Sequence, residues 1–368
     1  MVFVFWQNMV SIHQKAFLEA LAAHNGTTHV ILVVQELISA NRKNMGWDVP
    51  TLAGVKIVAA PGNSEAGELV MQWPEAVHVF SGLNVGPLNK YAMGQCIKAR
   101  RRIAVMSEPY NFREKKGILK RLKFTIDKMR YQKYIDFVLA IGTEGVSQFH
   151  EVGFADESVF PWAYYINIPA VVPPTAKKNQ QLLKIMYAGR LEEAKGIFRF
   201  AGELLKQKHD FELHVYGEGA DKDKISGSFA EAGATGKVRF YPFLKYEELL
   251  KQYVAYDWLV LPSTQKDGWG AVVSEALLNG LKVICSTRCG AGMVIKEGWN
   301  GLKFNWEVPG GCNAAISKMW EMNFAEQKEI EEWAGKALTG AAGATYFMQI
   351  VKHKYAGGVL PEAPWHLR

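Results

Sequence analysis

Two carboxylates stand eight residues apart in the stretch PSTQKDGWGAVVSEALLNGLKVICST, residues 262–287. They are Asp267 and Glu275. The pattern predicts the end of a buried strand, a glycine-broken loop, a short apolar helix that starts near Gly270, and a second strand. The N-terminus of such a helix favours an anion such as a phosphate, and small residues there let a ligand approach the backbone. The segment therefore predicts a site for a phosphorylated ligand.

The spacing of the two acids fits a nucleotide sugar. Eight residues of helix span about 12 Å, which is comparable to the distance between the two sugars of such a molecule. One acid could hold the hydroxyls of each sugar, with the diphosphate on the helix end between them. The alternative is structural: Glu275 caps or pairs within a packed helix, and Asp267 is a turn residue.

Cations follow an earlier predicted strand in the segment YAGRLEEAKG. Gly189 and Arg190 stand at the strand end, and Lys195 stands in the following turn. Arginine binds a diphosphate as a bidentate fork, and lysine binds it as a point charge. The alternative is a solvated loop that carries ordinary surface charges.

The next segment, HVYGEGADKD, places two glycines after another predicted strand. Gly217 and Gly219 make half of a dinucleotide-binding fingerprint, and without the third glycine this half is more typical of a tight turn. Asp221 and Asp223 have the spacing of a metal-binding D-x-D pair. They fall where a helix should begin, and because acids there complement the helix dipole, we expect no metal site.

The elements that must position these residues form two runs of alternating strands and helices. Short apolar runs between helical segments predict parallel sheets that are covered on both faces. We expect an α/β fold of two doubly wound, Rossmann-like domains that face each other across a cleft, with ligands beyond the carboxyl ends of the strands. The expected parts are an N-terminal domain at 1–165, a linker at 166–181, a C-terminal domain at 182–345, and a tail at 346–368 that packs back toward the N-terminal domain.

Composition narrows the class of protein. The chain has 368 residues, of which 49% are hydrophobic, so we expect a globular protein. Its formal net charge of +7 favours an anionic partner. Its four cysteines lack the neighbours of a zinc site, and we interpret them as reduced thiols of a cytosolic protein. The N-terminus MVFVFWQNMVS lacks the features of a signal peptide and predicts a buried strand, and no window predicts a membrane span.

Together these segments resemble the retaining glycosyltransferases of family 4, or group 1, which have the GT-B fold. The resemblance covers residues 182–305 through YAGRLEEAKG, HVYGEG, VRFYPF, DWLVLPS, DGWGAVVSEALLNGLKVI and NGLKF, in the family's order and spacing. Two positions depart from the family: Asp267 stands where Glu is usual, and Trp269 precedes Gly270 where Phe-Gly is frequent. We expect these departures to affect the choice of donor sugar.

The resemblance implies a metal-independent donor site in the C-terminal domain, with no cofactor, for a UDP- or GDP-sugar. Arg190 and Lys195 would neutralise the leaving diphosphate. Asp267 would bind hydroxyls of the donor sugar, and Glu275 would bind the ribose. The other donor-binding residues would lie near the nucleotide base, near the phosphates of the donor, or at the end of the strand before Arg190. They are Gly189, Gly217, Glu218, Arg239, Phe240, Gly270, Ala271 and Val272.

The resemblance assigns the acceptor to the N-terminal domain. Family members often carry a histidine after a mid-domain strand, where this chain reads VMSEPYNF, so Ser107 or Glu108 stands in its place. Glu108 is either an acceptor-side base or a surface acid. His13 either faces the acceptor or is a structural residue at a helix start.

A strongly basic segment runs from residue 98 to 133, with 13 Lys and Arg against 3 acids, a local net charge of +10. Apolar residues recur in it at helical spacing: Ile118, Leu119, Leu122, Ile126 and Met129. A basic amphipathic helix favours an anionic membrane surface, with contacts from Lys120, Arg121 and Lys123. The alternative is that the apolar stripe is core. Because no nucleic-acid motif accompanies the charge, we expect no nucleic-acid partner.

The function predicted in this way is retaining transfer of a hexose from a nucleotide sugar to a glycan acceptor. The acceptor would be lipid-linked and part of bacterial surface polysaccharide synthesis, at the inner face of the cell membrane. Two alternatives stay open: a GT-B nucleotide-sugar epimerase, and an inactive, membrane-docked binding protein of the same fold.

Overall fold

A computed structural model describes residues 1–40, 43, 48–83, 86–110, 117–167, 182–231 and 237–367. The chain forms two compact units. Unit 1 comprises Met1–Asn167 and Ala337–Arg368, and unit 2 comprises Ile168–Lys336. Most of the expected linker, residues 168–181, lies outside the described residues.

Unit 1 contains a parallel sheet of seven strands in the order β3-β2-β1-β4-β5-β6-β7. The strands are β1 Val2–Gln7, β2 His29–Val34, β3 Val55–Ala59, β4 Val77–Ser81, β5 Arg102–Ser107, β6 Phe137–Ile141 and β7 Val159–Trp162. The helices are α1 Ile12–Ala23, α3 Asn63–Gln72, α4 Gly86–Lys98, α5 Gly117–Tyr131, α6 Gly142–Glu151 and α13 Gly340–Ala356. The apolar N-terminus forms a buried strand, as the sequence predicts.

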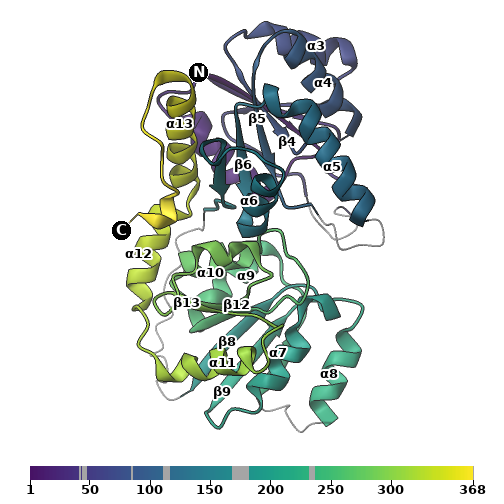
Figure 1. Ribbon diagram of the computed structural model, residues 1–368. Helices are drawn as coiled ribbons and strands as arrows, with labels where there is room; N and C mark the ends of the chain where they lie inside the picture. The colour runs from purple at the N-terminus through teal and green to yellow at the C-terminus, as the bar shows by residue number, and fades with distance from the viewer. Residues whose placement is uncertain are drawn as a thin grey trace. The chain divides into compact units, whose positions relative to one another are not determined.

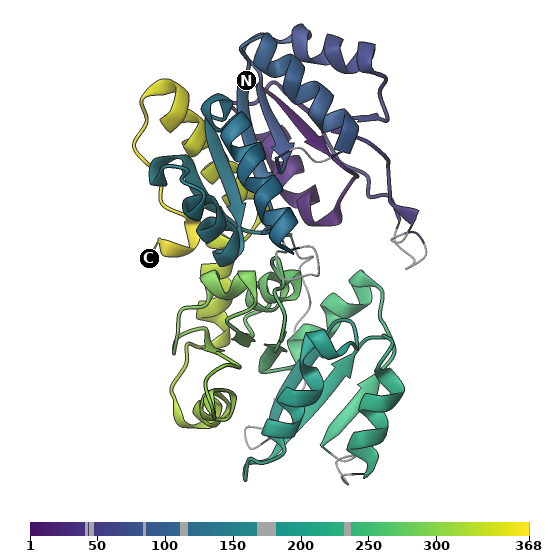
Figure 2. The ribbon, with the colours of Figure 1, turned by 45° about the vertical axis from the view of Figure 1, so that its right-hand side comes forward.

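Both faces of this sheet are buried, which explains why its strands are almost continuously apolar. Successive side chains of a strand point to opposite faces. In β1, Val4 and Trp6 belong to the core cluster shared with α3, α4 and α5. Phe3 and Phe5 contact aromatic rings of α1 and α13 on the other face. Accordingly, α13 lies on one side of the sheet and α4 and α5 lie on the other (Figure 1; Figure 2).

Unit 2 contains a parallel sheet of six strands in the order β10-β9-β8-β11-β12-β13. Its strands are β8 Leu183–Ala188, β9 Phe211–Tyr216, β10 Val238–Tyr241, β11 Trp258–Leu261, β12 Lys282–Ser286 and β13 Gly301–Phe304. Its helices are α7 Ile197–Leu204, α8 Lys222–Glu231, α9 Tyr246–Gln252, α10 Ala271–Leu278, α11 Gly311–Glu321 and α12 Gln327–Ala337. The two parallel sheets have the α/β class that the sequence predicts. Among the described residues, no helix combines the length and apolar character needed to cross a membrane.

The C-terminal helix α13 belongs to unit 1, although it follows unit 2 in the chain. The boundary expected at residue 345 falls inside α13, whereas unit 2 ends at Lys336. The reason is aromatic packing: the ring of Phe347 lies 5.2 Å from that of Phe3 and 5.6 Å from that of Phe17. Further buried residues of the same helix, Tyr346, Ile350 and Val351, extend this packing, so the whole of α13 belongs to unit 1.

We expect Phe347→Ala to lower the free energy of unfolding by about 3–5 kcal/mol, because it empties a fully buried ring site. Urea denaturation followed by circular dichroism measures this loss. The matched control is Phe243→Ala, at a ring that is 59% exposed, which should change stability by no more than about 0.5 kcal/mol. Equal, small losses in both variants would show that α13 does not anchor unit 1.

Candidate donor-binding site

The candidate site lies where the strand order of unit 2 reverses. β8 is followed in space by β9 on one side and by β11 on the other. The loops after β8 and β11 therefore run to opposite faces of the sheet, and ligands of doubly wound sheets bind in the crevice that opens between such loops. The first loop carries Arg190 and Lys195, and the second carries Ser263 and Asp267.

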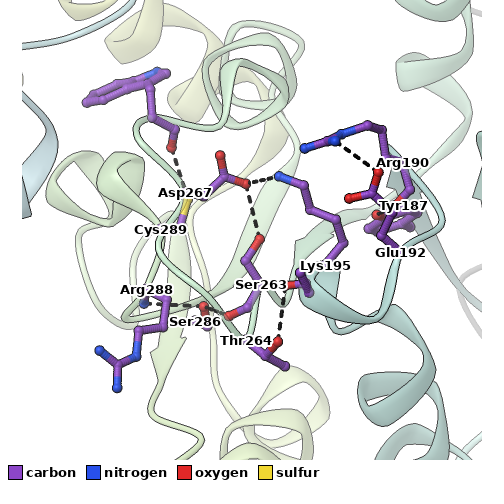
Figure 3. A network of polar contacts seen from close by, with 12 residues as sticks. Tyr187, Arg190, Glu192, Lys195, Ser263, Thr264, Asp267, Ser286, Arg288 and Cys289 are labelled. Atoms are coloured by element: carbon purple, nitrogen blue, oxygen red, sulfur yellow. Dashed lines mark hydrogen bonds and ion pairs between the residues drawn. The ribbon is translucent and has the colours of Figure 1, made fainter. Parts of the chain in front are cut away.

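An ion pair joins these two loops. The Nζ atom of Lys195 lies 2.5 Å from Oδ2 of Asp267, and the two side chains are only 20% and 19% exposed. Ser263 Oγ donates a second hydrogen bond to Oδ2 over 3.1 Å (Figure 3). The structure thus brings together an ammonium that can bind phosphate and a carboxylate that can accept hydrogen bonds from sugar hydroxyls.

The backbone around Asp267 is fixed from the next strand. Its N–H donates to the carbonyl of Arg288 over 2.9 Å, and its carbonyl accepts from Gly290 N–H over 3.0 Å. Ser286, at the end of β12, donates through Oγ to the carbonyl of Ser263 over 2.6 Å (Figure 3). The loops after β8 and β11 thus contact the carboxylate, and the end of β12 fixes the backbone that carries it.

The two serines are functional candidates that the sequence interpretation missed. Ser263 and Ser286 are fully buried, and each follows or ends an apolar strand. A buried hydroxyl needs a partner, so a serine beside a strand end four residues before an acid was a usable signal. The link between Ser286 and Ser263 spans 23 residues and could not be predicted without the strand order.

A glycine lets the two loops approach each other. Gly196 has a φ of 70°, and a Cβ atom at this position would lie 2.1 Å from the carbonyl oxygen of Pro262. Next to it, Thr264 N–H donates to the carbonyl of Ala194 over 2.9 Å. Any larger residue at 196 would push apart the loops that carry Lys195 and Asp267.

Arg190 lies on the same loop as Lys195 but has a different partner. Its guanidinium contacts Glu192 over 2.9 Å and is more than half exposed. Its carbonyl accepts a hydrogen bond from the hydroxyl of Tyr187 over 2.7 Å (Figure 3). Glu192 was not among the predicted site residues. It forms an ion pair with Arg190 on the loop that also carries Lys195.

Further donor-site candidates of unit 2 lie either in the loops after β8 and β9 or on β10. Gly189 and Gly217 lie in close backbone contact, since a Cβ atom at Gly217 would lie 1.9 Å from the carbonyl oxygen of Gly189. Glu218 pairs with Lys222 over 2.7 Å, at the start of α8.

Arg239 and Phe240 lie on β10. Arg239 pairs with Glu212 over 3.0 Å, and Phe240 packs against the ring of Phe229. Among the described contacts, none joins these two residues to the pair of Lys195 and Asp267. Asp221 accepts a hydrogen bond from the N–H of Glu193 over 2.8 Å, so this acid of the D-x-D segment has a structural role.

The helix α10 begins as predicted. Gly270 has a φ of 92° at its N-cap, and Ala271 and Val272 form its first turn. The first N–H groups of an α-helix have no acceptor within the helix and can meet a phosphate.

Glu275, on the same helix, is buried and accepts a 2.6 Å hydrogen bond from the hydroxyl of Tyr253. Burial raises its pKa to about 7, although the hydrogen bond from Tyr253 acts in the opposite direction. The structure therefore pairs Glu275 with a tyrosine that the sequence interpretation did not select.

In unit 1, the two acceptor-side candidates meet through a third residue. The ring of His13 stacks on that of Tyr164 at 5.0 Å with an interplanar angle of 10°. The hydroxyl of Tyr164 contacts the carboxylate of Glu108. His13 lies in the first turn of α1, Glu108 follows β5 and Tyr164 follows β7, so all three lie at carboxyl ends of strands or just beyond. Tyr164 was missed because it lies 56 residues from Glu108.

Two doubly wound parallel sheets, each in a separate unit of one chain, are the architecture of the GT-B fold. Residues 173–335 match the family model of the glycosyl transferases group 1. The match covers less than half of the chain, and within that segment it confirms the resemblance found in the sequence.

Comparison with individual proteins agrees with this family. The chain is 24% identical over 190 residues to the lipopolysaccharide 1,6-galactosyltransferase of Salmonella typhimurium, covering 48% of this chain and 51% of that protein. The chain spans about half or less of the length of the curated relatives it matches.

Two solved structures share the fold over nearly the whole chain. The lipopolysaccharide outer core galactosyltransferase WaaB, in its apo form, superposes with a TM-score of 0.70 at 17% identity, over 96% of this chain and all of that chain. HepE of Anabaena, in complex with UDP, superposes with a TM-score of 0.68 at 12% identity, over 96% of this chain and all of that chain.

The raised pKa of Glu275 predicts a stability that depends on pH. The folded protein keeps the proton up to pH about 7, whereas the unfolded carboxyl releases it near its ordinary value of 4.5. The unfolded state therefore binds fewer protons between these values, and stability falls as the pH rises through this window. We expect the difference in unfolding free energy between wild type and Glu275→Gln to fall by about 2–3 kcal/mol from pH 5 to pH 8.

Urea denaturation at the two pH values measures this difference. The control is Glu307→Gln, at a side chain that is two-thirds exposed, which should leave the pH dependence of the wild type unchanged. A Glu275→Gln variant with the wild-type pH dependence would contradict a protonated, buried Glu275.

Proposed function

We propose that this protein transfers a hexose, with retention of configuration, from a nucleotide sugar to a glycan acceptor. The observation that carries the proposal is the pair of Lys195 and Asp267 at the switch point of unit 2, inside the segment that matches the family. Unit 2 then binds the donor, and unit 1 binds the acceptor.

In this proposal the leaving group is stabilised by fixed positive charge. Lys195 and Arg190, together with the N–H groups of Ala271 and Val272, bind the diphosphate. Both cations already have carboxylate partners, Asp267 and Glu192, so the loop is charged and ordered before the donor arrives. Charges placed in advance stabilise the charge that develops on the phosphate without a metal ion or a cofactor.

The transfer step keeps the acceptor and the leaving group on one face of the sugar. The bond from the anomeric carbon to the phosphate oxygen breaks, and its electron pair stays on that oxygen. The acceptor hydroxyl forms the new bond and gives its proton to the same phosphate oxygen. Asp267 accepts hydrogen bonds from hydroxyls of the donor sugar through Oδ1, since its present contacts fall on Oδ2.

We assign the nucleoside end of the donor to Glu275, to the loops after β8 and β9, and to β10. Glu275 binds the ribose by exchanging the hydroxyl of Tyr253 for a ribose hydroxyl. Gly189 and Gly217 allow the chain close to the nucleotide, and Glu218, Arg239 and Phe240 border the base. A UDP- or GDP-sugar is the donor, and the fold neighbour that binds UDP supports UDP as the first candidate.

The acceptor site is assigned to His13, Tyr164 and Glu108. Stacked rings offer a flat apolar surface to a sugar ring, and the carboxylate accepts hydrogen bonds from its hydroxyls. We place the acceptor on a lipid carrier, in bacterial surface polysaccharide synthesis at the inner face of the cell membrane. The support is that a relative and a fold neighbour are lipopolysaccharide galactosyltransferases.

A donor screen tests the proposal. The protein is incubated with UDP-, GDP-, ADP- and dTDP-sugars, with and without a chelator, and thermal shift and release of nucleoside diphosphate are measured. We expect saturable stabilisation by one donor and slow release that the chelator does not change. Conversion of the donor sugar without an acceptor would instead identify an epimerase. No response to any donor would identify an inactive protein of the same fold.

With the donor known, Asp267→Asn separates charge from shape. The variant keeps the side-chain size but loses a charged acceptor, which should lower kcat/KM for transfer about 100-fold or more. The melting temperature and the unfolding transition check that the loop still folds. The control is again Glu307→Gln, which lies on the surface of the same unit. Transfer at the wild-type rate in Asp267→Asn would refute the role of this residue.

A further inference from the structure

Helix α5 of unit 1 has two apolar faces that point in opposite directions. Phe124 and Tyr131 are buried, and Phe124 packs against the rings of Tyr110 and Phe149. A second set of apolar side chains on the same helix is exposed: Leu119 by 64%, Leu122 by 57%, Ile126 by 55% and Met129 by 72%. For these four described residues, the alternative that the stripe belongs to the core is therefore wrong.

The helical geometry places the four exposed residues on one side of the helix. At about 100° per residue, Leu119, Leu122, Ile126 and Met129 fall within an arc of about 80°. The buried residues Phe124 and Tyr131 fall about 160–180° from the middle of that arc. We call these four exposed residues the apolar stripe of α5. The side chains of Ile118 and Lys120, which the sequence also assigned to this surface, lie outside the described part of the structure.

Cations flank the apolar stripe on both sides. By the same rotation of about 100° per residue, Lys123 and Arg130 lie about 20–40° beyond one edge of the stripe. Arg121 and Lys128 lie about 80–100° beyond the other edge, toward the sides of the helix. Lys123, Arg121 and Arg130 are exposed. Arg121 contacts Glu151 over 3.5 Å, while both side chains stay more than half exposed. The acid on the helix itself, Asp127, is buried on the core side.

We propose that the apolar stripe of α5 and its flanking cations dock unit 1 on an anionic lipid bilayer. Four apolar side chains in a row can enter the acyl boundary, while lysine and arginine on both flanks reach the phosphates of the headgroups. The charge decides between occupants. A second copy of this chain would bring the same cations face to face, whereas anionic lipid is attractive on both flanks at once. This inference does not depend on the sugar-transfer activity.

Flotation of the full chain with vesicles tests the proposal. One set contains phosphatidylcholine alone, and the other contains phosphatidylcholine mixed with phosphatidylglycerol. We expect binding to the mixed vesicles, at least about tenfold weaker binding to the neutral ones, and release by salt. The apolar variant is Leu122→Ser with Ile126→Ser, and the charge variant is Lys123→Glu with Arg130→Glu. Each should weaken binding to anionic vesicles at least about tenfold.

Matched substitutions in unit 2 serve as controls. Phe243→Ser changes another exposed apolar side chain, and Lys318→Glu with Lys328→Glu reverses two exposed lysines. Both should bind like the wild type. The proposal is overturned if the wild type does not bind anionic vesicles, if it binds neutral ones equally well, or if the α5 variants bind as tightly as the controls. A dimer in analytical ultracentrifugation that the apolar variant abolishes, without vesicle binding, would assign this face to a second copy instead.

Discussion

The contact between Lys195 and Asp267 depends on the loops after β8 and β11 meeting, and the candidate site depends on that contact. The order of the strands makes the meeting possible, because these two strands are neighbours across the point where the winding reverses. Gly196 makes it close, since no other residue leaves room for the carbonyl of Pro262. The ion pair also holds each charge in place, and a buried charge without a partner would be costly.

Hydrogen bonds from other parts of unit 2 hold these two loops in place. Ser286 binds the backbone of Ser263, and Ser263 binds the carboxylate, so the end of β12 takes part in orienting Asp267. Glu275 lies in a different environment, because it is buried next to Tyr253 and its pKa is raised to about 7. Two acids of one motif thus have different environments: Asp267 is ion-paired and 19% exposed, and Glu275 is buried. This difference suits one acid to a sugar beside a diphosphate and the other to a ribose.

Much of the fold was predictable because its signals are local. Apolar runs of strand length, helical periodicity and loop glycines predicted two parallel α/β units, and the motifs between residues 182 and 305 predicted the family. The partners of the site residues were not predictable, since Tyr164 lies 56 residues from Glu108 and Tyr253 lies 22 residues before Glu275. The end of unit 2 was placed at residue 345 instead of Lys336, because nothing local shows that Phe347 packs on Phe3.

The sequence by itself determined the class of fold, the positions of the loop acids and cations, and the stripe of apolar residues on α5. These properties follow from residue types and spacing along one segment. The tertiary structure alone decided which loops meet, which hydroxyls hold Asp267, and which apolar face of α5 stays exposed. The physical reason is that burial and hydrogen bonding are settled between segments, and an amphipathic pattern gives the same periodicity whether its apolar face meets a core or a membrane.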